Sequence, residues 1–353
     1  MSLPPSEIPQ GAIRFNTDSQ KLEFYAQDQW WEMVIDTPAL GTGADTGAGA
    51  RGVFGGGRQA PVATIDYINI ASTGNAISFG SLTGSYSIRG ACASSTRGVW
   101  SGGYSPSPGA SPYGRVNVID YVTISSTGNA IDFGDTAGGT KRQSQSGFSN
   151  STRGIFTSGY EIDFFPAAYR NTLDYITIAT TGNAINFGNI TAGASSANAT
   201  FASSTRGIIA GGEGPTPSTN IINFVTIATL GNTSDFGDLS RTLYGAGGCS
   251  NATRGIIAGG YVAPVYLNTI DYLTISTLGN AVSFGTLSTA DRGLTNGTCA
   301  SSTRGVVAGG FTPANSNVID YVVITTTGNA VDFGDLTSAR YDIGGLSNAH
   351  GGL

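Results

Sequence analysis

Arginine and aspartate recur at fixed places along this chain, and their spacing is the first hint of chemistry. The phrase Arg-Gly followed by two apolar residues occurs six times, and an apolar run follows each copy. A ring of arginines would suit anion binding, whereas an arginine beside an aspartate on a neighbouring strand would be a structural ion pair. We favour ion pairs. The expected members are Arg51, Arg97, Arg153, Arg254 and Arg304 with Asp66, Asp120, Asp174, Asp271 and Asp320. The fourth unit has Asn223 in the aspartate position, which predicts a weaker partner for Arg206.

The other residues that could do chemistry do not form a repeated site. DFGD occurs in three units, but the others read SFGS, NFGN and SFGT there, so we expect no metal. His350, the only histidine, has no acid pattern beside it that would indicate a catalytic triad. Three cysteines share one position with apolar residues of other units, which predicts buried filler. That position holds Cys92, Phe148, Phe201, Cys249, Cys299 and Leu346.

Carboxylates outside the repeated framework are few, which argues against an enzyme. Glycoside hydrolysis needs two carboxylates that converge in one pocket, and the S-x-D-x-G-x-x-W boxes of sialidases are missing from the sequence. The acids in question are Glu161, Asp163, Glu213, Asp291 and Asp342. We therefore expect no catalytic residues and no cofactor.

Composition excludes several classes of protein. The 353 residues are 39% hydrophobic and 11% charged, which is typical of a folded chain with a sizeable core. The net charge of −6 disfavours nucleic-acid and anionic-lipid surfaces, which attract clustered positive charge. No apolar stretch is long enough to predict membrane insertion, and MSLPPSEIPQ does not read as a secretory signal.

Internal repetition decides the fold class. The six Arg-Gly copies are 46 to 56 residues apart, and each unit adds an apolar run such as VIDYVTI and a segment such as TGNAIDFG. A further short strand precedes each Arg-Gly, and a spare copy of it, RYDIGGLSN, lies at the C-terminal end. Four strands in each of six units predict an all-β fold, a six-bladed β-propeller closed by the C-terminal strand.

The unit resembles the kelch repeat. A double glycine follows an apolar strand, and a second apolar strand contains Asp-Tyr, as in Asp120-Tyr121. The resemblance covers about residues 51–350, and it implies a propeller without implying an activity. It departs from the pattern in the last strand, where phenylalanine stands in place of the frequent tryptophan. The glycine pairs are Gly102-Gly103, Gly211-Gly212, Gly259-Gly260 and Gly309-Gly310.

Residues 1–40 are unlike the repeats. GAIRFN, KLEFYA and WWEMVI predict a small β-meander, and a glycine-rich linker (41–50) joins it to the propeller (51–353). A sheet this small needs something to pack on, either the propeller or another subunit. The stretch GAIRFNTDSQKLEFYAQDQWWEM resembles segments of tail-fibre and other virion proteins of tailed bacteriophages, cyanophages in particular. That resemblance implies attachment to other virion proteins, and the need for a packing partner makes a homo-oligomer our expectation. The docking residues would be Phe15, Phe24, Trp30 and Trp31.

The connection between the second and third strands differs from unit to unit, whereas the other connections are nearly constant. Variable loops on a constant scaffold carry specificity, and aromatic side chains suit glycan or protein recognition. The alternative is that these loops only cover one another. The aromatic residues expected at this end are Tyr104, Tyr113, Tyr160, Phe164, Phe165, Tyr169, Tyr261, Tyr266 and Phe311.

Together these patterns predict a non-enzymatic virion structural protein, assembled in the host cytoplasm. We expect a tail-fibre or adhesin component that binds a host-surface glycan or protein. The alternatives are a capsid or tail decoration protein without receptor binding, an intracellular kelch-like interaction protein and, less favoured, a propeller enzyme that degrades polysaccharide.

Overall fold

The computed structural model describes residues 8–16, 21–32, 50–58, 62–87, 89–105, 114–157, 159–161, 168–193, 196–214, 218–289, 297–311 and 313–353. These residues form an all-β protein, and the only helical element among them is a 3-10 turn, η2 (Ala137–Gly139). None of the described segments forms a helix long and apolar enough to cross a membrane.

The N-terminal meander is a three-stranded antiparallel sheet of β1 (Ile13–Asn16), β2 (Lys21–Ala26) and β3 (Gln29–Glu32). Gln27 and Asp28 join the last two strands with positive φ angles of 51° and 60°. This backbone matches the twist of a two-residue hairpin turn. The three strands expected from the sequence are therefore confirmed, within a few residues at their ends.

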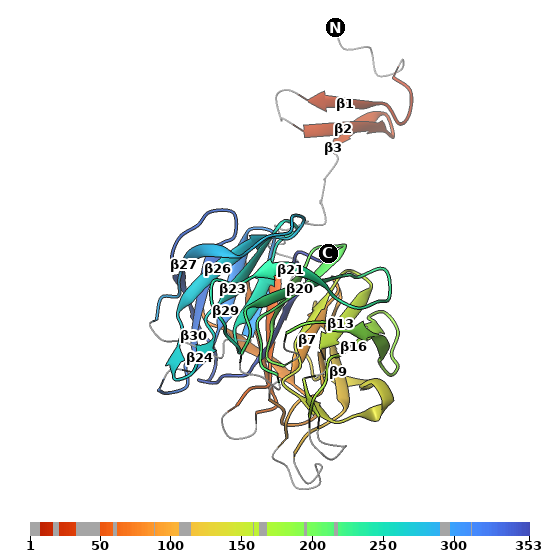
Figure 1. Cartoon of the computed structure of the whole chain (residues 1–353). Helices are drawn as coiled ribbons and strands as arrows, with labels where there is room; N and C mark the ends of the chain where they lie inside the picture. Colours follow the sequence, from red (N-terminus) through yellow and green to blue (C-terminus); the bar gives the residue numbers. More distant parts are fainter. Residues whose placement is uncertain are drawn as a thin grey trace.

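Six four-stranded antiparallel sheets make up most of the remaining described chain (Figure 1). Sheet one contains β32 (Gly344–Ser347), β4 (Arg51–Gly55), β5 (Thr64–Asn69) and β6 (Ile77–Ser81). Sheet two contains β7 (Gly90–Ala93), β8 (Arg97–Ser101), β9 (Val118–Thr123) and β10 (Ile131–Asp135). Sheet three contains β12 (Gly147–Ser149), β13 (Arg153–Thr157), β16 (Thr172–Thr177) and β17 (Ile185–Asn189).

The last three sheets repeat the same order. Sheet four contains β18 (Ala199–Ala202), β19 (Arg206–Ala210), β20 (Ile221–Thr226) and β21 (Ser234–Asp238). Sheet five contains β22 (Gly247–Ser250), β23 (Arg254–Ala258), β26 (Thr269–Thr274) and β27 (Val282–Thr286). Sheet six contains β28 (Gly297–Ala300), β29 (Arg304–Ala308), β30 (Val318–Val323) and β31 (Val331–Asp335).

The expected pairing of the C-terminal strand with the first Arg-Gly strand is confirmed. β32 lies antiparallel to β4, with Gly344 opposite Gly55 and Ser347 opposite Gly52. The first strands of the six sheets, which we call the inner strands, also contact one another in order, from β7 through β12, β18, β22 and β28 to β32. Because β32 in turn contacts β7, the contacts between sheets form a closed cycle.

The glycine of each Arg-Gly is explained by the contact between neighbouring sheets. A Cβ atom at Gly207 would lie 1.9 Å from the Phe148 ring of the preceding sheet, and one at Gly154 would lie 2.5 Å from Cys92 Sγ. The same relation joins Cys299 to Gly52, from the last sheet to the first. The residues of the shared cysteine position are buried, so their predicted role as apolar filler is confirmed. Burial raises the pKa of the Cys249 thiol to about 12.

The inner strands define the two ends of the six-sheet body. The constant end lies where they finish, at Ala93, Ser149, Ala202, Ser250, Ala300 and Ser347. The variable end lies where they begin, beside the connections of differing sequence. Two small sheets belong to the variable end, and their strands are short. They are β11 (Arg142–Gln143) with β14 (Tyr160–Glu161) and β15 (Ala168–Tyr169), and β24 (Tyr261–Val262) with β25 (Val265–Tyr266).

Candidate functional site

The predicted pairing of the Arg-Gly arginines with the strand aspartates is wrong. Arg51 lies opposite Asn69, whereas Asp66 lies opposite Phe54. Asp66 therefore shares a face of the sheet with Phe54. Because Arg51 is three positions from Phe54 on the same strand, the Arg51 side chain points to the opposite face. The same register separates Arg97, Arg153, Arg254 and Arg304 from Asp120, Asp174, Asp271 and Asp320.

Each Arg-Gly arginine instead stacks on an aromatic ring and bonds to the next sheet. The guanidinium of Arg51 lies 4.8 Å from the centre of the Tyr67 ring and donates a hydrogen bond to the Ile124 carbonyl at 3.0 Å. Arg304 of sheet six donates to the Ile70 carbonyl of sheet one, so these bonds also run in a cycle. Arg206 behaves like the others, since it stacks on Phe224 and donates to Ile275. The weaker partner expected for Arg206 is therefore also wrong.

The strand aspartates have other partners, deeper in the sheets. Asp66 accepts hydrogen bonds from Arg340 at 2.9 Å and from the Thr337 hydroxyl at 2.8 Å. Arg340 and Asp66 are fully buried although they lie 274 residues apart in sequence. Asp120 pairs with Arg89 in sheet two, and Asp174 pairs with Arg142 in sheet three. Asp271 accepts from Ser240, and Asp320 accepts from Ser288. The arginine of each ion pair lies in the segment just before an inner strand, and its aspartate lies on the third strand of the same sheet. Each pair therefore holds the segment before the inner strand against the sheet to which that strand belongs.

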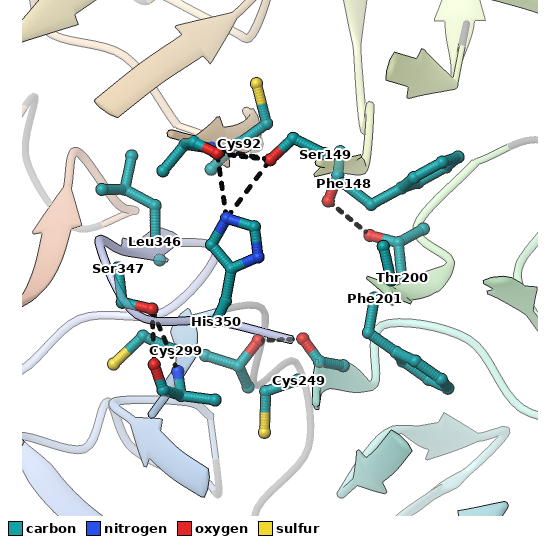
Figure 2. Close-up of a pocket in the computed structure, with 18 of the residues that line it drawn as sticks. Cys92, Phe148, Ser149, Thr200, Phe201, Cys249, Cys299, Leu346, Ser347 and His350 are labelled. Atoms are coloured by element: carbon teal, nitrogen blue, oxygen red, sulfur yellow. Dashed lines mark hydrogen bonds between the residues drawn. The ribbon is translucent and has the colours of Figure 1, made fainter. Parts of the chain in front are cut away.

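The constant end is filled by the last residues of the described chain. The His350 ring lies among the ends of the inner strands, beside a cavity of about 60 Å³ (Figure 2). Its Nε2 lies 2.9 Å from the Ala93 carbonyl oxygen, and its Nδ1 accepts a hydrogen bond from the Gly352 N–H at 3.1 Å. The Gly351 N–H donates to Ser250. Burial lowers the pKa of His350. A lowered pKa favours the neutral imidazole, and the ring fills this end of the six-sheet body.

The variable end carries a belt of aromatic and charged side chains. On one side, ring centres are 5.3 Å apart for Tyr244 and Tyr261, 4.7 Å for Tyr261 and Tyr266, and 5.3 Å for Tyr266 and Phe311. On the other side, Tyr160 contacts Tyr169 at 4.9 Å, and the Tyr169 hydroxyl bonds to Glu213. We call these residues the aromatic belt. Its described members are Tyr104, Tyr160, Tyr169, Tyr244, Tyr261, Tyr266, Phe311 and Tyr341, joined by Arg58, Arg115 and Glu213.

A pocket of about 310 Å³ opens inside the belt. Tyr244, Tyr261 and Tyr266 form one part of its wall, and Arg58, Glu213 and Asp342 supply its charges. Its lining also includes Gln143, Ser144, Ala197 and Gly245. The pocket therefore combines aromatic faces with hydrogen-bonding groups from several sheets, which is the composition of a small-molecule site.

Burial perturbs the pKa values of groups around this pocket. It raises the pKa of the Asp342 carboxyl to about 6, and the neighbouring Arg58 guanidinium opposes the rise. Burial followed by the charge of Glu213 raises the pKa of Tyr169 and of Tyr244 to about 12. At neutral pH Tyr169 and Tyr244 are therefore neutral hydrogen-bonding groups.

The N-terminal meander presents an apolar face. Ile13 lies opposite Phe24, and Phe24 lies opposite Trp31, so their side chains share one face with that of Phe15. These four side chains are exposed. Trp30 was also expected to be a docking residue. It lies on the other face, where its ring contacts Tyr25 and lies 4.2 Å from the Arg14 guanidinium.

The aromatic residues expected at the variable end are brought together for six of the nine positions, and they are half-buried rather than fully exposed. The other three, Tyr113, Phe164 and Phe165, lie outside the described residues. Sequence reasoning missed Tyr244, Tyr341 and Arg58, and it identified Glu213 and Asp342 only as acids outside the repeats. The tyrosines had a signal, since each precedes an inner strand, as in LYGAG and YDIGG.

Comparison with known proteins does not place the chain in a family. No protein-family model matches the sequence, and no curated protein matches it significantly. The function therefore has to be inferred from the geometry of the two ends and of the meander.

Proposed function

We propose that the chain is a non-enzymatic structural protein of a tailed-phage virion, a tail-fibre or adhesin component that binds a host-surface glycan through the aromatic belt. In this proposal residues 51–353 form a six-bladed, kelch-like β-propeller, and the N-terminal meander attaches it to other virion proteins. The observation that carries the proposal is the belt itself, which gathers aromatic side chains around a pocket at the one end where the repeats differ.

The propeller is supported by three independent cycles of contact. The inner strands contact one another in a cycle, the arginines bond from sheet to sheet, and the apolar side chains pack on the glycine of the following sheet. In a propeller each sheet is one blade, and neighbouring blades pack face to face around a central axis. A six-membered cycle is what six blades would produce.

The place where the first sheet strand begins, at Arg51, supports attachment at one end of the propeller and ligand binding at the other. The Arg51 N–H donates to the Asn348 side chain at 2.8 Å, so the first sheet strand begins beside the residues that fill the constant end. Attachment would then be at one end of the propeller and ligand binding at the other. This arrangement leaves the belt accessible to a host surface.

The glycan proposal is tested on an array of bacterial surface glycans. The wild-type protein should bind a restricted set, and Tyr261→Ala with Tyr266→Ala should reduce binding about 100-fold, because two stacking contacts are lost. Asp332→Asn, on the exposed edge of β31, is the matched control and should bind normally. Normal binding by the double variant would remove the belt from the proposal. Binding only to host outer-membrane proteins would replace the glycan with a protein receptor.

The meander proposal is tested by mass photometry. A three-stranded sheet with four exposed apolar side chains needs a partner in water, and we propose that copies of this chain supply it in a homo-oligomer. Phe15→Ser with Phe24→Ser should convert the assembly to monomer. Asn16→Ser, which changes the other face, should not. A wild-type monomer at micromolar concentration would contradict the homo-oligomer.

A second candidate function is hydrolysis of a surface polysaccharide, and one observation favours it. Glu213 and Asp342 both line the pocket, and two carboxylates are what glycoside hydrolysis requires. A reducing-end assay on each glycan that binds decides the matter. Release of sugar by the wild type, and none by Glu213→Gln, would establish the enzyme over the binding protein.

A further inference from the structure

The pocket inside the belt contains a carboxylate whose hydrogen bonds are not satisfied by the described part of the protein. The Asp342 side chain is 8% exposed, and the closest cation, Arg58 Nη1, lies 3.8 Å from Oδ2. No hydrogen bond reaches this carboxylate from the residues that the structure describes. A buried carboxylate without donors is costly to the fold, and a donor from a ligand would relieve that cost.

The backbone beneath the pocket is held in a strained form. Ser144, Ala197 and Asp342 have φ angles of 59°, 52° and 57°, and Gly245 occupies the same place in its unit at 66°. The left-handed region costs a residue with a side chain about 1 kcal/mol. Hydrogen bonds from Ala197 N to Ser144 O and from Gly245 N to Ala197 O, both 2.9 Å, join these segments across the inner strands. The pocket floor is therefore fixed before any ligand binds.

The axis below the floor offers no passage to a polymer. The cavities farther along the inner strands measure about 40 and 60 Å³, and the constant end is filled by His350 and the glycines that follow it. Along the described inner strands these two cavities are too small for a polymer to pass from the pocket to the constant end. A glycan that enters the pocket from the belt would therefore do so by a chain end or a branch tip.

The charges of the pocket select among sugars. Two carboxylates, Glu213 and Asp342, face one guanidinium, Arg58, so the balance at neutral pH is negative. A sugar acid would bring a third negative charge into a partly buried site. Sugar hydroxyls, in contrast, can donate to both carboxylates while a ring face lies on a tyrosine.

Building on the glycan-binding function above, we propose that this pocket binds the terminal residue of a neutral glycan, with sugar hydroxyls donating to Asp342 and Glu213 and the ring against Tyr261. The belt outside the pocket then contacts the sugars that follow. Specificity depends on the terminal sugar, and the rest of the glycan adds affinity.

The test compares paired oligosaccharides that share a backbone and differ in their non-reducing end, one neutral and one ending in a uronic acid. Each is immobilised by its reducing end, and the full-length protein is titrated by biolayer interferometry. Neutral ends should bind at least about tenfold more tightly than acidic ends. Asp342→Asn, which tolerates the left-handed backbone, and Glu213→Gln should each weaken neutral binding about tenfold.

A pH series separates a binding role of Asp342 from a merely structural one. Because its pKa is about 6, the wild type should gain affinity as the pH rises from 5 to 7, and Asp342→Asn should lose this gain. Circular dichroism confirms that each variant is folded. Asp332→Asn again serves as the control.

Four outcomes would overturn the inference, and one of them would also remove the proposed function. Preference for acidic ends, or equal binding to glycans with their non-reducing ends blocked, would exclude the terminal-sugar pocket while leaving glycan binding by the belt intact. Normal binding by both carboxylate variants would do the same. Failure of the wild type to bind any glycan would remove the proposed function together with the pocket.

Discussion

The two ends of the six-sheet body are built from the same repeats, yet they differ in how completely their polar groups are satisfied. At the constant end, His350 has a partner on each ring nitrogen, and the Ser149 and Ser347 hydroxyls donate to the Ala93 and Ala300 carbonyls. At the variable end, a buried carboxylate lacks donors among the described residues, and several residues have strained backbones. Close packing of the inner strands requires the satisfied polar groups of the constant end. The arrangement at the variable end costs stability, and the proposed binding role would account for its presence.

The strongest test of this comparison targets the framework between the two ends. Replacing Arg340 with Met should lower the free energy of unfolding by about 3–5 kcal/mol, because it leaves Asp66 charged and buried without its ion-pair partner. Urea unfolding measures the loss. Adding Asp66→Asn, which copies the Asn223 of the fourth unit, should restore a substantial part of it. A loss under 1 kcal/mol for the single variant would show that the pair does not hold the closing strand.

A second framework test concerns the contact between sheets. Gly207→Ala should cost about 3 kcal/mol, since the new methyl group would overlap the Phe148 ring. Phe148→Ala in the same chain should remove this overlap, so the loss in the double variant should be smaller than the sum of the two single losses. Thermal unfolding of the single and double variants checks this. Independent, additive effects would argue against direct contact between sheets three and four.

At the variable end the account predicts a gain in stability. The Asp342 carboxyl has its pKa raised to about 6 in the folded state, so the folded protein holds this proton more tightly than the unfolded chain does. Its contribution to stability therefore falls as the pH rises from about 4 to 6. Asp342→Asn should be about 2 kcal/mol more stable than wild type at pH 7, and the difference should vanish near pH 4. A variant less stable at pH 7 would mean that the carboxylate supports the fold.

His350 should give a smaller effect with the opposite dependence on pH. Its pKa is lowered by burial, so its contribution is present above the ordinary histidine pKa and is lost as the pH falls through the folded value. His350→Gln keeps a neutral donor and acceptor, and should cost about 1 kcal/mol at pH 7. The variant should also lose stability less steeply between pH 7 and 5. Parallel pH curves for both proteins would exclude this role for His350.

Much of the fold could be predicted from the sequence, because the repeats copy the same physical requirements. The four strands of each unit and the pairing of the C-terminal strand with the first sheet both followed from the pattern. The partners of the arginines did not follow. Spacing along the chain does not show that Arg51 and Asp66 lie on opposite faces, because that depends on register.

The place of the aromatic belt was predictable, but the charged groups of its pocket were not. Variable loops indicated this end, and several of their tyrosines form the belt. Glu213 and Asp342 stood out only as acids outside the repeats. Glu213 and Asp342 line the same pocket because units more than 100 residues apart in sequence contact each other. A local sequence pattern does not show such contacts.

The central claim is that the variable end binds ligand and the constant end does not. Hydrogen exchange with mass spectrometry tests it directly, using the oligosaccharide that gives the strongest array signal. The account predicts slower exchange at saturation in the variable connections and in the segments before the inner strands, and unchanged exchange in residues 344–353. Protection confined to residues 344–353 and the connections of the constant end would contradict it.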